Sequence, residues 1–98
     1  MATVNTSVGV LLKIDLHDMA LWQAKDRIRE ELDKTVNGEE SGLYLIHGYN
    51  SGDRIKTYIR GGALGNSMKD RGISARIVGF KGNRGTTGII LVEPDTDA

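Results

Sequence analysis

Hydrophobic and polar residues alternate along positions 8–16, which predicts a β-strand with one buried face. The even positions from Val10 to Leu16 supply the apolar side chains. Asp15 and His17 share the opposite face, because side chains two positions apart point to the same side of a strand. The strand therefore ends in a carboxylate and an imidazole that can contact each other.

The apolar spacing changes to three and four residues after this strand, which predicts an amphipathic helix over residues 20–36. Asp18 is its expected N-terminal cap, and Asn37-Gly38 is expected to end it. Trp22 lies one position off the apolar stripe and is expected to pack at its edge. The stripe itself consists of Leu21, Ala24, Ile28 and Leu32.

A short apolar run at 43–46 predicts a second strand that is covered on at least one face. A second helix is expected to be capped by Ser51 and to end at Gly61-Gly62. A shorter helix would begin near Asn66-Ser67 and close at Gly72.

Runs rich in isoleucine and valine predict two further strands at 74–80 and 87–93, joined by a hairpin tip at 81–85. The order β-α-β-α-β-β predicts an α/β fold. We expect a two-layer sandwich in which a four-stranded mixed sheet carries its helices on one face. The first two strands should be parallel, since a helix connects them.

The domain organisation expected from these patterns is simple. Residues 1–9 form a flexible N-terminal tail, residues 10–93 a single domain, and residues 94–98 an acidic C-terminal tail. The 98 residues include no cysteine, which rules out disulfides and thiolate metal sites and fits a cytoplasmic protein. No apolar run reaches the roughly 20 residues of a membrane span. We expect a monomer that is a complete small protein.

The net charge is zero, but the charges are unevenly distributed. Residues 47–84 carry eight basic and two acidic side chains, a net charge of +6, whereas both flanking segments are acidic. If these cations gather in space, they form a face that attracts anions such as nucleic acid. If they are scattered, they form an ordinary solvated surface.

A second histidine repeats the layout of the first. His47 follows the 43–46 strand just as His17 follows the strand at 8–16. Parallel strands end at the same sheet edge, where α/β proteins bind ligands, so the two histidines should lie near each other. Gly48 and Gly52 would let the backbone approach a ligand, and the helix starts that follow favour anions.

Each segment also has a simpler interpretation. An isolated Asp-x-His is more often ordinary polar surface, and a glycine-rich turn often serves only to reverse the chain. Asp15, His17 and His47 could instead supply a carboxylate and two imidazoles to a divalent ion. The sequence shows no further ligand, and no metal or other cofactor is expected.

Taken together, the two segments resemble the small MutS-related (Smr) domain. The resemblance rests on Leu12-Lys-Ile-Asp15-Leu16-His17, on Ile46-His47-Gly48-Tyr-Asn-Ser-Gly52, and on the glycines and apolar run of 85–93. That family carries an L-D-L-H strand end, an H-G-x-G loop and a similar last strand. The resemblance covers residues 11–93 and implies a fold like the C-terminal domain of bacterial translation initiation factor three.

Members of the family bind nucleic acid, and several are endonucleases that nick DNA or cleave RNA, some at stalled ribosomes. The resemblance implies that Asp15 and His17 form a catalytic pair and that His47, with Gly48 and the loop to Gly52, binds backbone phosphate. In the expected mechanism His47 is a further catalytic residue that protonates the leaving oxygen or holds the phosphate. The nucleic-acid contacts would come from Gly48, Tyr49, Asn50, Ser51, Gly52, Arg54, Lys56, Lys81 and Arg84.

The sequence departs from the family pattern at three places. Asp18-Met19-Ala20 stands where the family often has Gly-Leu-Thr, and Asn50 replaces the second glycine of H-G-x-G. Tyr49 stands in place of a common lysine and offers a ring on which a base can stack.

The expected function is therefore endonucleolytic cleavage of RNA or nicking of DNA by metal-independent Asp/His chemistry, in ribosome rescue or DNA repair. The first alternative is a non-catalytic module that binds nucleic acid or the ribosome. The second is a domain that uses the same cleft for a small ligand or a protein.

Overall fold

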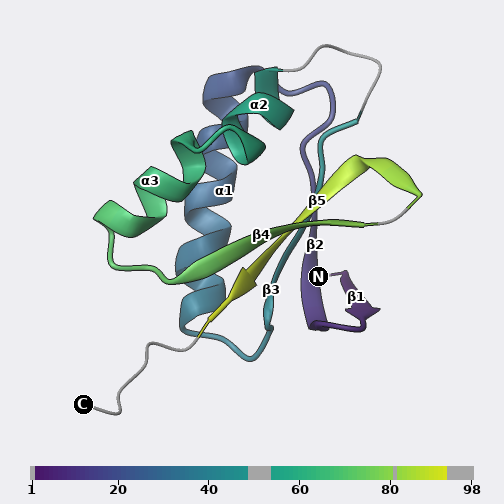
Figure 1. The fold of residues 1–98 in the computed structure, drawn as a ribbon, viewed down its shortest axis with the longest axis vertical. Coiled ribbons are helices and arrows are strands. Elements are labelled where there is room, and N and C mark those ends of the chain that lie inside the picture. Colours follow the sequence, from purple (N-terminus) through teal and green to yellow (C-terminus); the bar gives the residue numbers. More distant parts are fainter. Residues whose placement is uncertain (1, 49–53, 81, 93–98) are drawn as a thin grey trace.

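A computed structural model describes residues 2–48, 54–80 and 82–92. They form one mixed sheet with strand order β1-β2-β3-β5-β4, and three helices lie on one of its faces (Figure 1). The predicted two-layer α/β arrangement is confirmed. The elements are β1 (Thr3–Thr6), β2 (Gly9–Asp15), α1 (Leu21–Val36), β3 (Gly42–Ile46), α2 (Arg54–Arg60), α3 (Ala63–Asp70), β4 (Ala75–Phe80) and β5 (Asn83–Leu91).

The prediction of four strands is wrong, because β1 adds a fifth from residues expected to be a flexible tail. β1 pairs antiparallel with β2 along the sheet edge, with Val4 opposite Leu11. The Thr6 hydroxyl donates a hydrogen bond to the Gly9 carbonyl across the connecting turn (2.8 Å). An edge strand that stays largely exposed needs no apolar alternation, so this segment carried no periodic signal.

The remaining strands pair as their connections require. β2 and β3 are parallel, with Ile14 opposite Leu45, which confirms the predicted β-α-β unit. β5 lies antiparallel to both β3 and β4. The predicted 81–85 hairpin tip is too long, because β5 already begins at Asn83. Lys81 and residues 94–98 lie outside the described residues.

The first helix matches its predicted bounds within one residue, but its start differs in detail. Ala20 is the N-cap, and its N–H donates to the side-chain oxygen of Gln23 (2.9 Å). Asp18 is therefore not the cap; it has a φ of 66° in the turn before the helix. Trp22 is also not packed at the stripe edge, since 67% of its surface is exposed.

The glycine pair breaks the second helical region as predicted. α2 ends at Arg60, and α3 begins at Ala63, after Gly62 with a φ of 100°. The start predicted near Asn66-Ser67 is therefore too late. Gly72 closes α3 as expected: its positive φ directs its own N–H to the Lys69 carbonyl and that of Ile73 to Met68.

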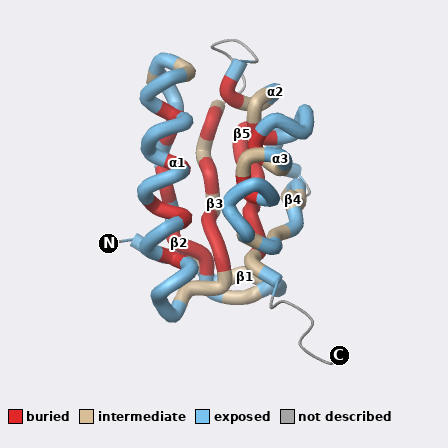
Figure 2. The backbone as a smooth tube through the Cα atoms, turned by 90° about the vertical axis from the view of Figure 1, so that its left-hand side faces the viewer, coloured by how far each residue is buried: buried red, intermediate tan, exposed pale blue. Residues whose placement is uncertain are grey.

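The hydrophobic core lies between the sheet and the helices (Figure 2). The strands contribute alternate positions to it, so the residues between them project from the opposite, helix-free face. In the described part of the chain, no helix has the length and apolarity to cross a membrane. The buried cluster contains Leu12, Ile14, Leu16, Ala24, Ile28, Leu32, Leu43, Leu45, Ile55, Ile59, Leu64, Met68 and Ile89.

Candidate active site

The two histidine segments meet at one edge of the sheet. Asp15 at the end of β2 lies opposite Ile46 at the end of β3, and the Leu16 N–H donates to the Ile46 carbonyl (2.7 Å). The N–H groups of His47 and Gly48 both donate to the Gly85 carbonyl of β5 (2.9 and 3.0 Å). The two segments therefore lie side by side at this edge, and β5 anchors the second of them.

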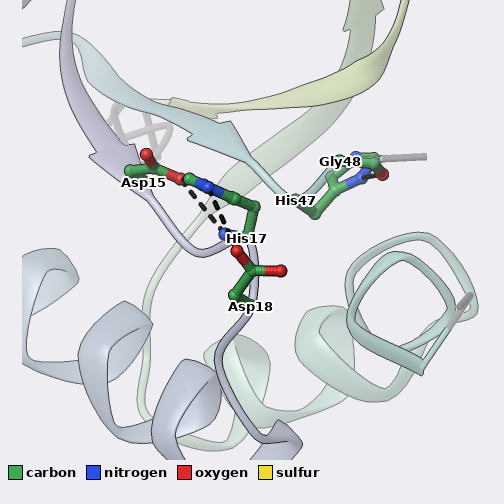
Figure 3. Close-up of polar contacts among 5 residues, drawn as sticks. All are labelled: Asp15, His17, Asp18, His47 and Gly48. Carbon is green, nitrogen blue, oxygen red and sulfur yellow. Dashed lines mark hydrogen bonds and ion pairs between the residues drawn. The ribbon is translucent and has the colours of Figure 1, made fainter. Parts of the chain in front are cut away.

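Asp15 and His17 form a carboxylate–imidazole pair on this edge (Figure 3). One carboxylate oxygen, Asp15 Oδ1, accepts hydrogen bonds from the ring Nδ1 and from the backbone N–H of His17, the latter at 3.1 Å. About half of each side chain is exposed. This contact raises the pKa of His17 above its ordinary value and lowers the pKa of Asp15.

Asp18 brings a second carboxylate to the same imidazole. Its Oδ2 lies 3.4 Å from Nε2 of His17, and its charge raises the pKa of the ring further. The turn explains this placement: the Met19 N–H donates to the Leu16 carbonyl (3.2 Å), and Asp18 takes a left-handed conformation. Aspartate tolerates that conformation better than most residues, although glycine adopts it at least cost.

His47, by contrast, is buried, and both of its ring nitrogens are engaged within the protein. Nδ1 donates to the Gly48 carbonyl (2.9 Å), which fixes the tautomer because a carbonyl only accepts. Nε2 therefore accepts from the Thr87 hydroxyl (2.8 Å), whose oxygen accepts from Nε of Arg60 (2.9 Å). Burial lowers the pKa of His47, and the charges of Arg60 and Lys56 lower it further.

The two histidines should therefore titrate on opposite sides of pH 6.5, their ordinary pKa. We expect NMR signals of the His17 ring to have a midpoint above 6.5 and those of His47 a midpoint below it. A His17→Gln variant assigns the two curves. If both rings titrate with midpoints near 6.5, neither the raised pKa of His17 nor the lowered pKa of His47 is correct.

Linkage gives opposite effects of these shifts on stability. The pKa of His47 is lowered in the folded state, so its contribution to the free energy of unfolding is complete above about pH 6.5 and is lost as the pH falls through the folded pKa. The pKa of His17 is raised in the folded state, so its contribution to the free energy of unfolding is complete below about pH 6.5 and is lost as the pH rises through the folded pKa.

Some of the predicted basic residues gather on the α2 side of this edge. Arg60 and Arg84 line one open concavity with the ends of β4 and β5, and Arg60 and Lys56 line another. Arg60 also donates to the Thr86 carbonyl (2.9 Å), so it links α2 to the sheet. Arg71, in contrast, is paired with Asp33 on the far end of α1.

A pocket of about 390 Å³ lies between the starts of α1 and α2. Asp18, His47 and Arg54 are among its lining residues, so the two segments contribute to one concave surface. Tyr49, Asn50, Ser51 and Gly52, which the resemblance assigns to phosphate binding, lie outside the described residues.

The alternative of a metal site finds no support in the geometry. Across residues 2–48, 54–80 and 82–92, no three histidine or carboxylate side chains gather as ligands of one ion. His47 in particular directs its ring nitrogens to Gly48 and Thr87.

Sequence patterns pointed to neither Arg60 nor Thr87 as part of the site. Arg60 counted as one of many cations, and Thr87 counted as one polar residue in an apolar strand. Their contact depends on packing α2 against β5, 27 residues apart in the chain. The one available signal was a polar residue at a core-facing position of a strand, which requires a hydrogen-bond partner.

No protein-family model, curated protein or solved structure matches this chain.

Proposed function

We propose that this chain is an Smr-like nucleic-acid-binding domain that cleaves RNA or nicks DNA with its Asp15–His17 pair. The observation that carries the proposal is an exposed imidazole whose Nδ1 is held by a carboxylate, so that Nε2 faces solvent and the neighbouring Asp18. A carboxylate that orients an imidazole and raises its basicity is the arrangement general-base catalysis requires.

RNA is the favoured substrate because its neighbouring 2′-hydroxyl can serve as the nucleophile. His17 takes the 2′-hydroxyl proton at Nε2 while the 2′-oxygen attacks the adjacent phosphorus. The P–O2′ bond forms, the P–O5′ bond breaks, and the 5′-oxygen takes a proton from water. Arg54, Lys56 and Arg84 lie where they could attract the phosphates, since α2 and the start of β5 border this edge.

His47 has a supporting part in this proposal. Both ring nitrogens are engaged, so donation of a proton to the leaving oxygen would first break an internal hydrogen bond. Its contact with the Gly48 carbonyl instead suits a role in holding the loop that the resemblance assigns to phosphate.

The turn after β2 also supports the proposed family. Asp18 occupies the position where the Smr pattern often has glycine, and its φ of 66° is a conformation that glycine adopts most readily. The two-layer arrangement with helices on one face agrees with the fold implied by the resemblance.

A cleavage assay tests the proposal. We expect purified protein to cut end-labelled RNA with or without EDTA, and the rate to rise with pH as His17 loses its proton above pH 6.5. The Asp15→Ala/His17→Ala double variant should lose cleavage yet bind the RNA with nearly unchanged affinity. Substrates with 2′-deoxyribose at the cleavage position should resist a 2′-hydroxyl mechanism.

A matched variant guards against contaminating nuclease. Asp26→Ala/Arg29→Ala removes an exposed ion pair on α1 that has no part in the proposed chemistry, and it should cleave like wild type when purified identically. Cleavage by the Asp15/His17 double variant at the wild-type rate would contradict the assignment.

A non-catalytic nucleic-acid or ribosome-binding module is the second candidate. It is favoured by Asp18, whose carboxylate lies 3.4 Å from the Nε2 that a general base must offer to substrate. If this carboxylate blocks Nε2, the chain binds RNA with a steep salt dependence and cuts nothing during long incubation. If the Asp18→Gly variant cleaves RNA, the result would support the endonuclease over the binding module.

A further inference from the structure

One face of the sheet is left without helices by the described part of the chain, and it carries an aromatic pair. Tyr44 and Phe80 approach with ring centroids 4.9 Å apart and planes tilted by 42°. They meet across Gly88, where an added Cβ would lie 2.9 Å from the Phe80 ring. The Asn83 side chain donates to the Tyr44 hydroxyl (3.3 Å), which holds that ring in place.

Strand register shows that this pair faces away from the core. Leu43, Leu45 and Ile89 point to the helices, so the intervening Tyr44 and Gly88 point to the open face. Both aromatic residues are half-buried, so part of each remains accessible to solvent. Two partly exposed rings on an open sheet face are what stacking of nucleic-acid bases uses.

The charges around the pair favour a polyanion. Lys13 lies opposite Tyr44 on the neighbouring strand, and Arg76 lies two residues before Val78, which also contacts the Gly88 position. Both cations are exposed, and neither forms an ion pair with another described residue. Asp15 is the one carboxylate among the described strand residues of this face, and His17 is bound to it.

The aromatic pair is continuous with the catalytic pair. Tyr44 lies opposite Lys13, and one step further along the same face Ile46 lies opposite Asp15. If the bases of a nucleic-acid strand stack on Tyr44 and Phe80, the sugar–phosphate backbone of that strand would therefore lie close to Asp15 and His17.

We propose that the open sheet face binds unpaired nucleotides, stacking their bases on Tyr44 and Phe80 beside the Asp15–His17 pair. The proposal rests on the nucleic-acid function and adds the substrate class: single-stranded segments rather than intact duplex. Paired bases cannot reach the rings, because a duplex keeps its bases stacked on one another.

The test compares the affinities of wild type, Tyr44→Leu and Phe80→Leu for a fluorescent ten-residue oligouridine and for a duplex of equal length. We expect wild type to prefer the single strand, and each leucine variant to lose about tenfold in single-strand affinity. Trp22→Leu is the matched control, because it removes an exposed ring from α1 and should leave affinity unchanged. Unchanged affinity in folded Tyr44→Leu and Phe80→Leu would overturn the proposal.

Crosslinking provides a readout that needs no variant. We expect 4-thiouridine oligonucleotides to crosslink the wild-type protein in peptides that contain Tyr44 or Phe80. Crosslinks confined to the helices would overturn the proposal. So would a concentration-dependent dimer that Tyr44→Leu abolishes and oligouridine leaves intact, because the face would then bind a second copy of the chain.

The outcomes separate this inference from the proposed cleavage. If the leucine variants bind normally while cleavage still depends on Asp15 and His17, only the sheet-face inference fails. If the leucine variants bind weakly and neither the wild type nor any variant cleaves RNA, the cleavage proposal fails. The open sheet face is then the binding site of a non-catalytic module.

Discussion

Gly42→Ala should destroy the fold, with a loss of about 4 kcal/mol or more in the free energy of unfolding, a large share of a small domain's stability. A Cβ at this position would lie 1.9 Å from the Ile89 carbonyl oxygen and 2.9 Å from its carbon. Both atoms belong to the backbone of β5, so no side-chain rotation relieves the overlap. The β3–β5 pairing at the centre of the sheet must separate instead. Urea unfolding followed by circular dichroism measures the loss.

Gly65→Ala is the matched control for this substitution. Gly65 lies within α3, and an added Cβ there meets nothing within 4 Å. Alanine is favoured over glycine in a helix, so we expect a gain of up to about 1 kcal/mol. A Gly42→Ala protein as stable as wild type would show that β3 and β5 can separate locally without cost.

Elements with a strong period could be predicted from the sequence, whereas elements without one could not. α1 was placed within one residue because its apolar residues recur at helical spacing and face the sheet. β1 was missed because its residues, Thr3–Thr6, form an exposed edge strand that is held by backbone pairing. No side-chain pattern reports such pairing.

The site followed the same division. The Asp15–His17 contact could be predicted because two-residue alternation is a local property of one strand. Asp18 was predicted as a helix cap, and this prediction is wrong, because composition does not reveal which residue of a turn takes a positive φ. The surroundings of His47 depend on α2 and β5 packing together, and that register is set by the whole fold.

Thr87→Val should lower the free energy of unfolding by about 2–3 kcal/mol, because it leaves a buried histidine nitrogen without its partner. The Thr87 hydroxyl donates to Nε2 of His47 and accepts from Nε of Arg60, and the threonine is fully buried. Valine has the same shape but can do neither. Thr87→Ser keeps the hydroxyl and removes one methyl group, so we expect a loss of only about 1 kcal/mol.

The pair of Thr87 variants distinguishes hydrogen bonding from packing. If both lose the same stability, the methyl group rather than the hydroxyl stabilises this position, and the relay from Arg60 to His47 is incidental. If valine alone is costly, the same relay should matter for function, because His47 holds the Gly48 carbonyl at the start of the proposed phosphate loop. RNA affinity should then fall in Thr87→Val and stay near the wild-type value in Thr87→Ser. Thr87 itself touches neither the open sheet face nor the Asp15–His17 pair.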